Sequence, residues 1–313
     1  MKSKKIYDFI KMKKITFIIP VVIALAGLIM GLVAGLEVDI EFKGGTILTY
    51  GYSGELSMDD VKSAVEAGGF GTVNVTKASA VTSNLETVQI SFASNEGLTV
   101  DVQSQVTDLL VEKFAANNIE QLNSQDVNPS SGATFFVKCL VAVLFSFLLL
   151  LIYIGFRFKK IGGISAGVFS LVALLHDVII VFCVFIFFRL PIDANFMAVI
   201  LTILGYSINN TIIIYDRVRE NKTLYGKKMD IRELVNTSIS QTLNRSIATT
   251  VTTAIAVLSI CVIAFLFGVE SIISFAFPMF MGLIAGAFSS IFLSGPMWAI
   301  WQEHKLKKGT KTK

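Results

Sequence analysis

Long apolar runs dominate the hydropathy pattern of this chain. An α-helix needs roughly 20 apolar residues to cross a bilayer, and six runs are of about that length. They predict transmembrane helices at residues 15–36, 134–156, 162–188, 195–216, 247–267 and 273–298. The first run follows a basic segment, residues 1–14, and superficially resembles a signal peptide. It is longer than a signal-peptide core and no small-residue cleavage site with a polar flank closes it, which favours an uncleaved helix.

Residues 37–133 have a different pattern, in which short apolar stretches are interrupted by polar ones. Alternation of apolar and polar residues is typical of half-buried strands, and helical spacing is typical of an amphipathic helix. The elements predicted, in order, are strand Thr46–Tyr52, helix Met58–Ala67, strands Thr72–Thr76 and Thr87–Phe92, helix Val100–Ala115 and strand Ile119–Val127. The order β-α-β-β-α-β predicts one ferredoxin-like α+β domain.

The remaining segments are polar and basic. Residues 217–245 connect the fourth and fifth predicted helices, and within them Asp230–Leu243 is amphipathic and is expected to lie along the membrane surface. Residues 299–313 form a basic tail. Of the 27 Lys and Arg residues, 21 fall on one side of the predicted helices. Because basic loops stay inside, we expect both termini in the cytoplasm and residues 37–133 outside.

Composition places the chain in the membrane class. It is 53% hydrophobic and 16% charged, whereas soluble domains have about 25% charged residues. The three cysteines lie in apolar runs without disulfide or metal-ligand spacing, and the two histidines form no metal-binding motif. We therefore expect a polytopic α-helical membrane protein, with no metal, cofactor or nucleic-acid partner, that is not an enzyme.

Polar residues collect on one face of the fourth predicted helix. Thr202, Tyr206 and Asn210 are four residues apart, and Asn209 is adjacent, so they share a side of the helix. Each polar group in hydrocarbon needs a partner. They either hold neighbouring helices together, as is common in membrane bundles, or line an ion or proton path.

Asp177 lies close to the middle of the third predicted helix. Counting about 1.5 Å per residue puts it roughly 18 Å from Arg189, and Asn210 roughly 22 Å from Asn195, so the two could meet. An ionised carboxylate at this depth is costly unless it is paired or hydrated. Asp177 either makes a structural hydrogen bond to a neighbouring helix or forms part of an ion or proton path. The neighbouring His176 is expected to point about 100° away.

Several motifs carry a family resemblance. GYSINNTIIIYDRVREN (residues 205–221) resembles the signature of the SecF family, in which Asp is usual at the position of Asn210. QTLNRSI (241–247), VDIEFKGGT (38–46) and the His-Asp pair at 176–177 match the family as well. SecF forms the smaller part of the SecDF complex of bacterial protein export, within the resistance-nodulation-division (RND) superfamily. The resemblance therefore implies a six-helix RND-type bundle with one extracytoplasmic domain, in a bacterial plasma membrane.

The resemblance also implies a function. The chain would act with SecD to drive late steps of preprotein translocation with the membrane ion gradient, next to the SecYEG channel. No nucleotide-binding motif is present, so ATP hydrolysis would belong to SecA. In the family, the helix-four Asp and a following Arg are implicated in proton movement, and the matching positions are Asn210 and Arg245. Because an amide cannot titrate, Asp177 or an acid of SecD could substitute, or Asn210 and Tyr206 could hold Na⁺.

The other matching residues have structural interpretations. Asp216 and Arg217 match the family's Asp-Arg pair and are expected to fix the connector against the bundle. Gly44 and Gly45 permit a tight turn from membrane to domain, and Asp39 and Glu41 could pair with another subunit. Two alternative functions stay open: an RND-type exporter half for lipids or small molecules, and a scaffold for SecD and the channel without ion coupling.

Overall fold

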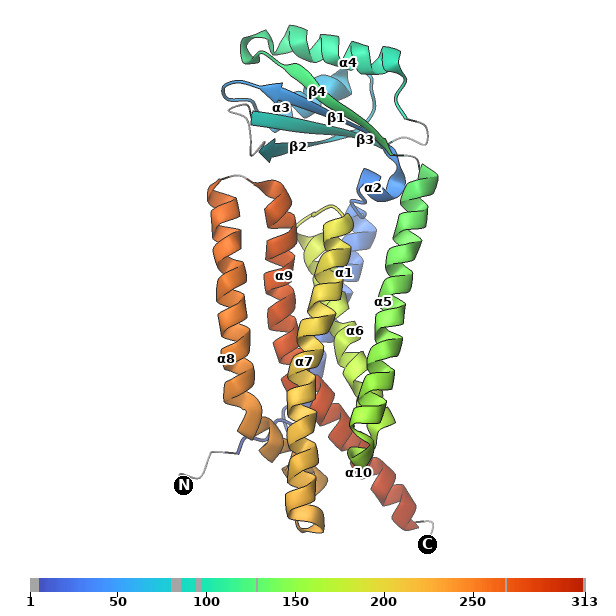
Figure 1. Cartoon of the computed structure of the whole chain (residues 1–313), viewed down its shortest axis with the longest axis vertical. Coiled ribbons are helices and arrows are strands. Elements are labelled where there is room, and N and C mark those ends of the chain that lie inside the picture. The colour runs from blue at the N-terminus through green and yellow to red at the C-terminus, as the bar shows by residue number, and fades with distance from the viewer. Residues whose placement is uncertain (1–5, 80–85, 94–96, 128, 268, 312–313) are drawn as a thin grey trace.

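The computed structural model describes residues 6–79, 86–93, 97–127, 129–267 and 269–311. It consists of an elongated helical bundle with a small sheet domain at one end (Figure 1). Among the described residues, six helices are long and apolar enough to cross a membrane. The two ends of the described chain lie at the end of the bundle remote from the sheet, which we call the terminal end, and the other is the sheet end (Figure 1).

Four antiparallel strands form the sheet, in the order β2-β3-β1-β4. The elements of this domain are β1 (Gly45–Tyr52), α3 (Met58–Ala67), β2 (Val73–Ser79), β3 (Glu86–Ala93), α4 (Val100–Lys113), the 3-10 helix η1 (Ala115–Asn117) and β4 (Glu120–Val127). Alternate strand residues such as Leu48, Tyr50 and Ile90 are buried in one cluster with Val65 of α3 and Leu110 of α4. Both helices lie on the side of the sheet that faces away from the bundle (Figure 1). The predicted ferredoxin-like order is confirmed.

Local capping chemistry explains where α3 begins. The Ser57 hydroxyl accepts a hydrogen bond from the Asp60 amide at 3.4 Å, which satisfies one of the free N–H groups at the helix start. Asp59 and Asp60 in the first turn add favourable charge. The helix spans Met58–Ala67, as predicted.

A short helix, α2 (Ile40–Lys43), and a glycine pair join the membrane to the sheet. Gly44 and Gly45 have φ values of +82° and +146°, a region that side chains disfavour, so they turn the chain directly into β1. The preceding segment is hydrogen-bonded to the loop near Ile192, whose amide donates to the Glu37 carbonyl at 2.7 Å and whose carbonyl accepts from the Asp39 amide at 3.1 Å.

The bundle is built around three central helices, which are α6 (Gly163–Phe187), α7 (Ala194–Tyr225) and α9 (Glu270–Ser289). The other helices are α1 (Lys13–Ala34), α5 (Pro129–Arg157), α8 (Ile231–Leu266) and α10 (Gly295–Lys311), with the short turns η2 (Lys159–Ile161), η3 (Gly226–Lys228) and the π-helix η4 (Ser290–Ser294). About half of α6 and of α7 is buried, whereas α1, α5 and α8 are mostly exposed. The exposed apolar faces of the outer helices suit contact with lipid or with another chain.

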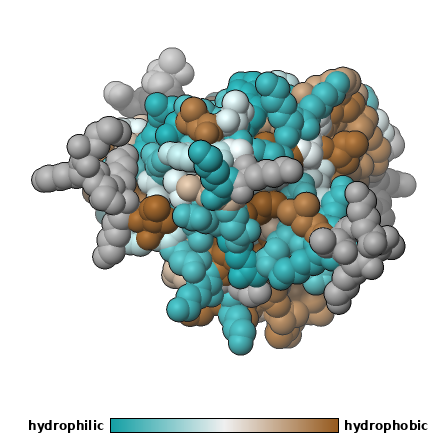
Figure 2. Space-filling view, turned by 90° about the horizontal axis from the view of Figure 1, so that it is seen from below, coloured by the Kyte–Doolittle hydropathy of each residue, from teal (hydrophilic) through white to brown (hydrophobic). Residues whose placement is uncertain are grey.

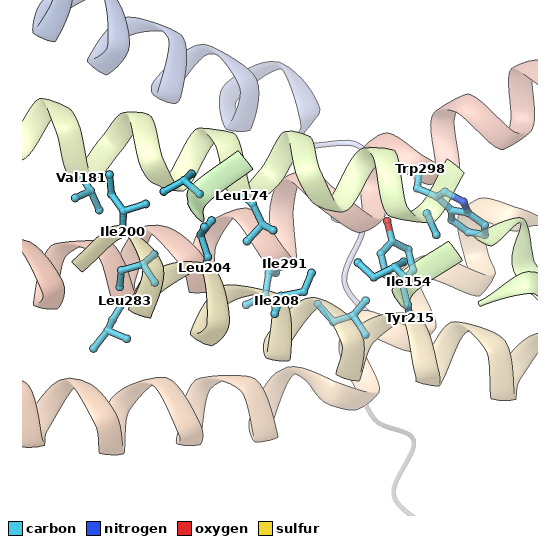
Figure 3. Close-up of a cluster of buried hydrophobic side chains, with 14 of the residues drawn as sticks. Ile154, Leu174, Val181, Ile200, Leu204, Ile208, Tyr215, Leu283, Ile291 and Trp298 are labelled. Atoms are coloured by element: carbon cyan, nitrogen blue, oxygen red, sulfur yellow. The ribbon is translucent and has the colours of Figure 1, made fainter. Parts of the chain in front are cut away.

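Branched aliphatic side chains fill the contact between the central helices. Figure 3 shows Val181 of α6, Ile200 and Leu204 of α7 and Leu283 of α9 meeting along this contact. Gly282 allows α9 to approach so closely that an added Cβ would lie 2.8 Å from Ile203 and 2.9 Å from Val181. The polar site described below is embedded in this apolar contact.

Two helices at the terminal end run past the predicted ends of their membrane spans. The helix that contains the predicted fourth span, residues 195–216, continues as α7 to Tyr225. The connector helix predicted at Asp230–Leu243 is not separate from the fifth membrane helix, because α8 runs without a break from Ile231 to Leu266. The residues between them, Asn244–Ser246, include neither Gly nor Pro that would end a helix.

The sixth predicted helix is interrupted. The run predicted as residues 273–298 comprises α9, the five-residue π-helix η4 and the start of α10. Single-turn π-helices occur mostly as insertions in α-helices and are frequent at functional sites. Here the π-helix begins at Ser290, which contacts α7, and follows Ser289, the last residue of α9, which contacts α6.

Candidate functional site

Asp177 is fully buried at the meeting point of α6, α7 and α9. Its Oδ2 atom accepts hydrogen bonds from Ser207 Oγ of α7 at 2.5 Å and Ser289 Oγ of α9 at 2.9 Å. Its Oδ1 atom lies 2.9 Å from His176 Nδ1. Every partner is a side chain that can donate to a carboxylate, which offsets part of the cost of burying the acid.

His176 contacts its neighbour in the chain. Adjacent positions on a helix point about 100° apart, and the His176 Nδ1 atom still lies 2.9 Å from Asp177 Oδ1. The ring also lies 6.0 Å from that of Phe288 on α9.

A line of buried hydroxyls extends from Asp177 toward the terminal end. Ser207, Thr211 and Tyr215 are four residues apart on α7 and face Ser290 and Ser294 of η4; we call these five residues the hydroxyl ladder. Ser290 Oγ donates to the Ser207 carbonyl at 3.1 Å, and Thr211 Oγ1 donates to Ser290 Oγ at 3.0 Å. Further along, Ser294 Oγ donates to the Tyr215 hydroxyl at 3.1 Å.

Sequence reasoning missed the hydroxyl ladder. The available signal was the four-residue spacing of 207, 211 and 215, repeated at 290 and 294. Serine and threonine are common in membrane helices, where they bond to carbonyls of their own helix. Only the packing of α7 against η4 distinguishes these hydroxyls from others, such as Thr252, whose Oγ1 donates to the Ala248 carbonyl.

Asn210 lies one turn beyond Ser207 and does not contact Asp177. Its side chain is 1% exposed, and neither its Oδ1 nor its Nδ2 has a hydrogen-bond partner among the described residues. Ser246 Oγ on α8 is likewise buried and unpaired within the described chain. One turn nearer the sheet end, Tyr206 donates to Thr250 Oγ1 at 2.9 Å. Asn210 and Ser246 therefore lie at the same level of the α7–α8 contact.

Arg245 is exposed on α8 next to Ser246. Within the described ranges its guanidinium makes no side-chain hydrogen bond or ion pair, and Asp177 is not its counter-charge: Asp177's ion-pair contact is with His176. Asn209 of α7 is exposed in the same way. The chain thus carries an amide and a guanidinium on the outside of its bundle, beside a buried unsatisfied amide.

Asp216 and Arg217 connect α7 to its neighbours at the terminal end. Asp216 lies 3.0 Å from Arg157 of α5 and 2.8 Å from Arg219. Arg217 Nε donates to Gln241 Oε1 of α8 at 2.5 Å. Since Asp216 is about a third exposed, its ion pairs add little free energy, and the pair's geometry suits holding helices in register.

The chain is similar in sequence to known Sec export proteins. Residues 106–304 match the family model of the protein export membrane protein SecD/SecF C-terminal region. The chain is 33% identical to the protein translocase subunit SecF of Rickettsia typhi, over 96% of this chain and 94% of that protein. It is 31% identical to the SecF of Alicyclobacillus acidocaldarius, over 97% and 96% of the two chains.

The fold has solved counterparts. A crystal structure of SecDF from Thermus thermophilus, described as a translocon-associated membrane protein, superposes with a TM-score of 0.79 at 26% identity. It covers 96% of this chain and 39% of the SecDF chain, so this chain spans about two fifths of that protein. The predicted RND-type membrane fold is confirmed. With a family model over more than half its length and near-complete SecF relatives, this chain belongs to the SecD/SecF family of protein-export membrane proteins.

Proposed function

We propose that this Sec export subunit acts with a SecD partner to drive late steps of preprotein translocation, using an ion gradient that its bundle conducts. In this proposal the terminal end faces the cytoplasm and the sheet domain faces outward, as the distribution of basic residues suggests. SecYEG supplies the channel and SecA hydrolyses ATP. The chain itself catalyses no reaction.

Asp177 carries the proposal. A carboxyl group buried between three membrane helices is expensive, so such groups are by default functional candidates. Its donors Ser207 and Ser289 are neutral hydroxyls that can rotate to donate or accept, so the site accommodates the ionised and the protonated acid. Between Asp177 and the terminal end, the hydroxyl ladder places further groups of this kind, in the hydrogen-bonded pairs Thr211–Ser290 and Ser294–Tyr215.

A second set of ligands supports a cation in place of a proton. The amide oxygen of Asn210 and the hydroxyl of Ser246 are buried without partners among the described residues, and Tyr206 lies one turn away. Buried polar atoms that are left unpaired cost about 1–3 kcal/mol each. Neutral oxygen ligands of this kind can replace the hydration shell of Na⁺, although Asn210 itself cannot carry a proton.

Exposure of Arg245 and Asn209 supports the SecD partner. Exposed polar groups at membrane depth are unfavourable against lipid, and both lie on the α7–α8 side of the bundle. A partner bundle on this side would cover them and could supply an acid for Arg245.

Export of a model preprotein into vesicles tests the proposal. Vesicles containing this chain, its SecD, SecYEG and SecA are assayed while the proton gradient and the Na⁺ gradient are collapsed separately. Loss of stimulation with the proton gradient alone supports the Asp177 route, and loss with the Na⁺ gradient alone supports the Asn210 ligands. If the chain stimulates export to the same extent with both gradients collapsed as with both present, ion coupling is contradicted and the scaffold function is favoured.

A further inference from the structure

A cavity of about 620 Å³ opens on the outside of the bundle at the terminal end. It lies where α5 ends, α6 begins and α10 crosses them. Its volume is within the roughly 300–1,000 Å³ typical of small-molecule sites. None of the residues proposed for ion coupling lines it.

The cavity is positively charged at its rim. Lys159 and Lys305 line it from η2 and α10, and both are exposed. Within the described ranges neither is paired with a carboxylate; the Lys159 ammonium lies 4.6 Å from the Phe156 ring and that of Lys305 lies 5.4 Å from the Trp301 ring. The nearby Glu303 is already shared by Arg232 and Lys307. An anion entering the cavity therefore meets two available cations.

Backbone amides add to the preference of the cavity for an anion. The 25-residue helix α6 begins at Gly163 in the cavity wall and has no side-chain cap on its first turn. Ser165 turns its hydroxyl back to the Gly162 carbonyl at 2.7 Å. The free N–H groups and the positive end of the helix dipole favour negative charge at this point.

Apart from Gln302 and glycines, the rest of the lining is apolar. Ile164 and Val168 are 76% and 44% exposed, and the aromatic rings of Phe169 and Trp301 form one wall. Tryptophan is enriched where headgroups meet hydrocarbon. Figure 2 views the molecule from the terminal end: hydrophilic residues cover much of the face, and hydrophobic patches show both between them and at the edges. The cavity joins these two environments.

We propose that this cavity binds one phospholipid with an anionic headgroup, its phosphate between Lys159 and Lys305 and an acyl chain along Ile164 and Val168. A soluble phosphate would use the lysines but not the exposed apolar wall. A zwitterionic lipid would use the wall but gain less from the charge. Basic recesses between membrane helices at the headgroup level have the chemistry that anionic lipids require.

Tryptophan fluorescence offers a direct test, because the chain has two tryptophans and one of them, Trp301, lines the cavity. In Trp298→Phe, Trp301 is the sole reporter. The protein is reconstituted in phosphatidylcholine bilayers that contain increasing amounts of brominated phosphatidylglycerol. In a second series, the phosphatidylcholine is brominated and the phosphatidylglycerol is not. Comparing the bromine quenching in the two series gives the relative affinity of the two lipids for the site at Trp301. We expect phosphatidylglycerol to bind more tightly, with roughly a fivefold contribution from each lysine.

Matched variants identify the source of the preference. Lys159→Gln with Lys305→Gln should abolish it, whereas Lys11→Gln with Lys228→Gln, which removes equal charge elsewhere at the terminal end, should leave it. Equal quenching by both lipids in the parent, or an unchanged preference in the first variant, overturns the proposal. Displacement of the brominated lipid by inorganic phosphate alone would identify a free-anion site and contradict the lipid.

If Trp298→Phe fails to fold, native mass spectrometry of the chain with both tryptophans replaces the fluorescence assay. It counts phosphatidylglycerol molecules retained by the parent and by the same two double variants. One retained lipid that is lost with Lys159→Gln and Lys305→Gln is the expected result, and equal retention in all three proteins contradicts it.

Discussion

Asp177 is held by side chains that tolerate a change in its charge. Ser207 and Ser289 hydroxyls both contact its Oδ2 atom, and no Lys or Arg pairs with it within the described ranges. A fixed cation would hold the carboxylate permanently ionised, whereas hydroxyls can reverse their hydrogen bonds when a proton arrives. This residue can therefore alternate between two states within one packing arrangement.

Replacing Asp177 by Asn tests that role. The amide occupies the same volume and can still hydrogen-bond to both serines, so the chain should fold with nearly its normal thermal midpoint. It cannot titrate, so gradient-stimulated export should fall to the rate of vesicles with a collapsed proton gradient. The exposed Asp108→Asn is the matched control and should export normally. A normal rate in Asp177→Asn would show that Asp177 carries no proton.

Asn210→Asp is the converse experiment. It places a titratable acid one turn from Ser207 and beside the Ser246 hydroxyl, which has no partner among the described residues. If the partner already supplies a proton acceptor, little changes; if the chain relies on Na⁺, we expect export to lose Na⁺ dependence and gain proton dependence. The measurement is the ratio of export rates with each gradient collapsed. Asn209→Asp, on the exposed neighbour, should not change this ratio.

Among single residues, the sequence alone indicated those whose residue type is unusual in an apolar run. An acid or amide inside an apolar run is visible in the sequence, which is why Asp177, Asn210 and Tyr206 were candidates. Their partners were not visible: Asp177 meets Ser207 instead of Asn210, because the rotation of α7 about its axis depends on packing against α6 and α9. Nothing in the sequence sets Ser207 apart; only its contact with Asp177 does.

Among the elements, helix ends were harder to predict than helix presence. Hydropathy shows where a helix enters lipid, but a helix ends where backbone hydrogen bonding stops. The charged residues Asp216 and Glu220 are compatible with a helix, and Arg219 and Arg217 pair with them one turn away. The π-helix η4 was unpredictable, because its extra residue is accommodated by contacts of Ser290 with α7.

Gly282→Ala tests how closely α9 approaches α6 and α7. The new methyl group would lie within 2.9 Å of Ile203 and Val181, so the helices must separate, at a cost of about 1–3 kcal/mol. We expect a lower thermal midpoint for the purified chain in detergent. Gly205→Ala is the matched control, since nothing lies within 4 Å of its added Cβ. Equal midpoints for the two variants would argue against the tight contact.

The sheet domain contains a pH-sensitive pair between β2 and β3. Lys77 Nζ lies 2.7 Å from Glu86 Oε2, and the hydrogen bond that Lys77 donates lowers the pKa of Glu86 below its ordinary 4.5. A lowered acid pKa stabilises the fold above that ordinary value, and the contribution is lost as pH falls through the folded pKa. Both side chains are at least a third exposed, so the contribution is small.

Glu86→Gln should therefore lower the thermal midpoint slightly near neutral pH and leave it unchanged once the pH is below the folded pKa of Glu86. The comparison is made at each pH between the full chain and its variant. Glu112→Gln, on the exposed surface of α4, controls for the loss of one charge. A parent-variant difference that persists at low pH would contradict the ion-pair explanation.

For the whole molecule, the distribution of exposed polar groups indicates which side meets a partner. Arg245 and Asn209 are exposed on α8 and α7, and the hydrocarbon of a bilayer would offer such groups no hydrogen bonds. On the opposite side of the bundle in Figure 1, α5 exposes apolar residues such as Leu144, Leu148 and Leu149. The first side suits another protein and the second suits lipid.

Site-specific photo-crosslinking tests this asymmetry in the assembled complex. A benzophenone amino acid at position 209 should capture SecD, because the α7–α8 side needs a covering chain for Arg245. The same probe at Leu149 on α5, which is 50% exposed, should capture lipid or nothing. If SecD is captured from position 149 but not from 209, the partner covers α5 instead, and Arg245 cannot take its counter-charge from SecD. Capture from 209 alone would place SecD beside Asn210 and Ser246, where a partner acid could complete the ion path.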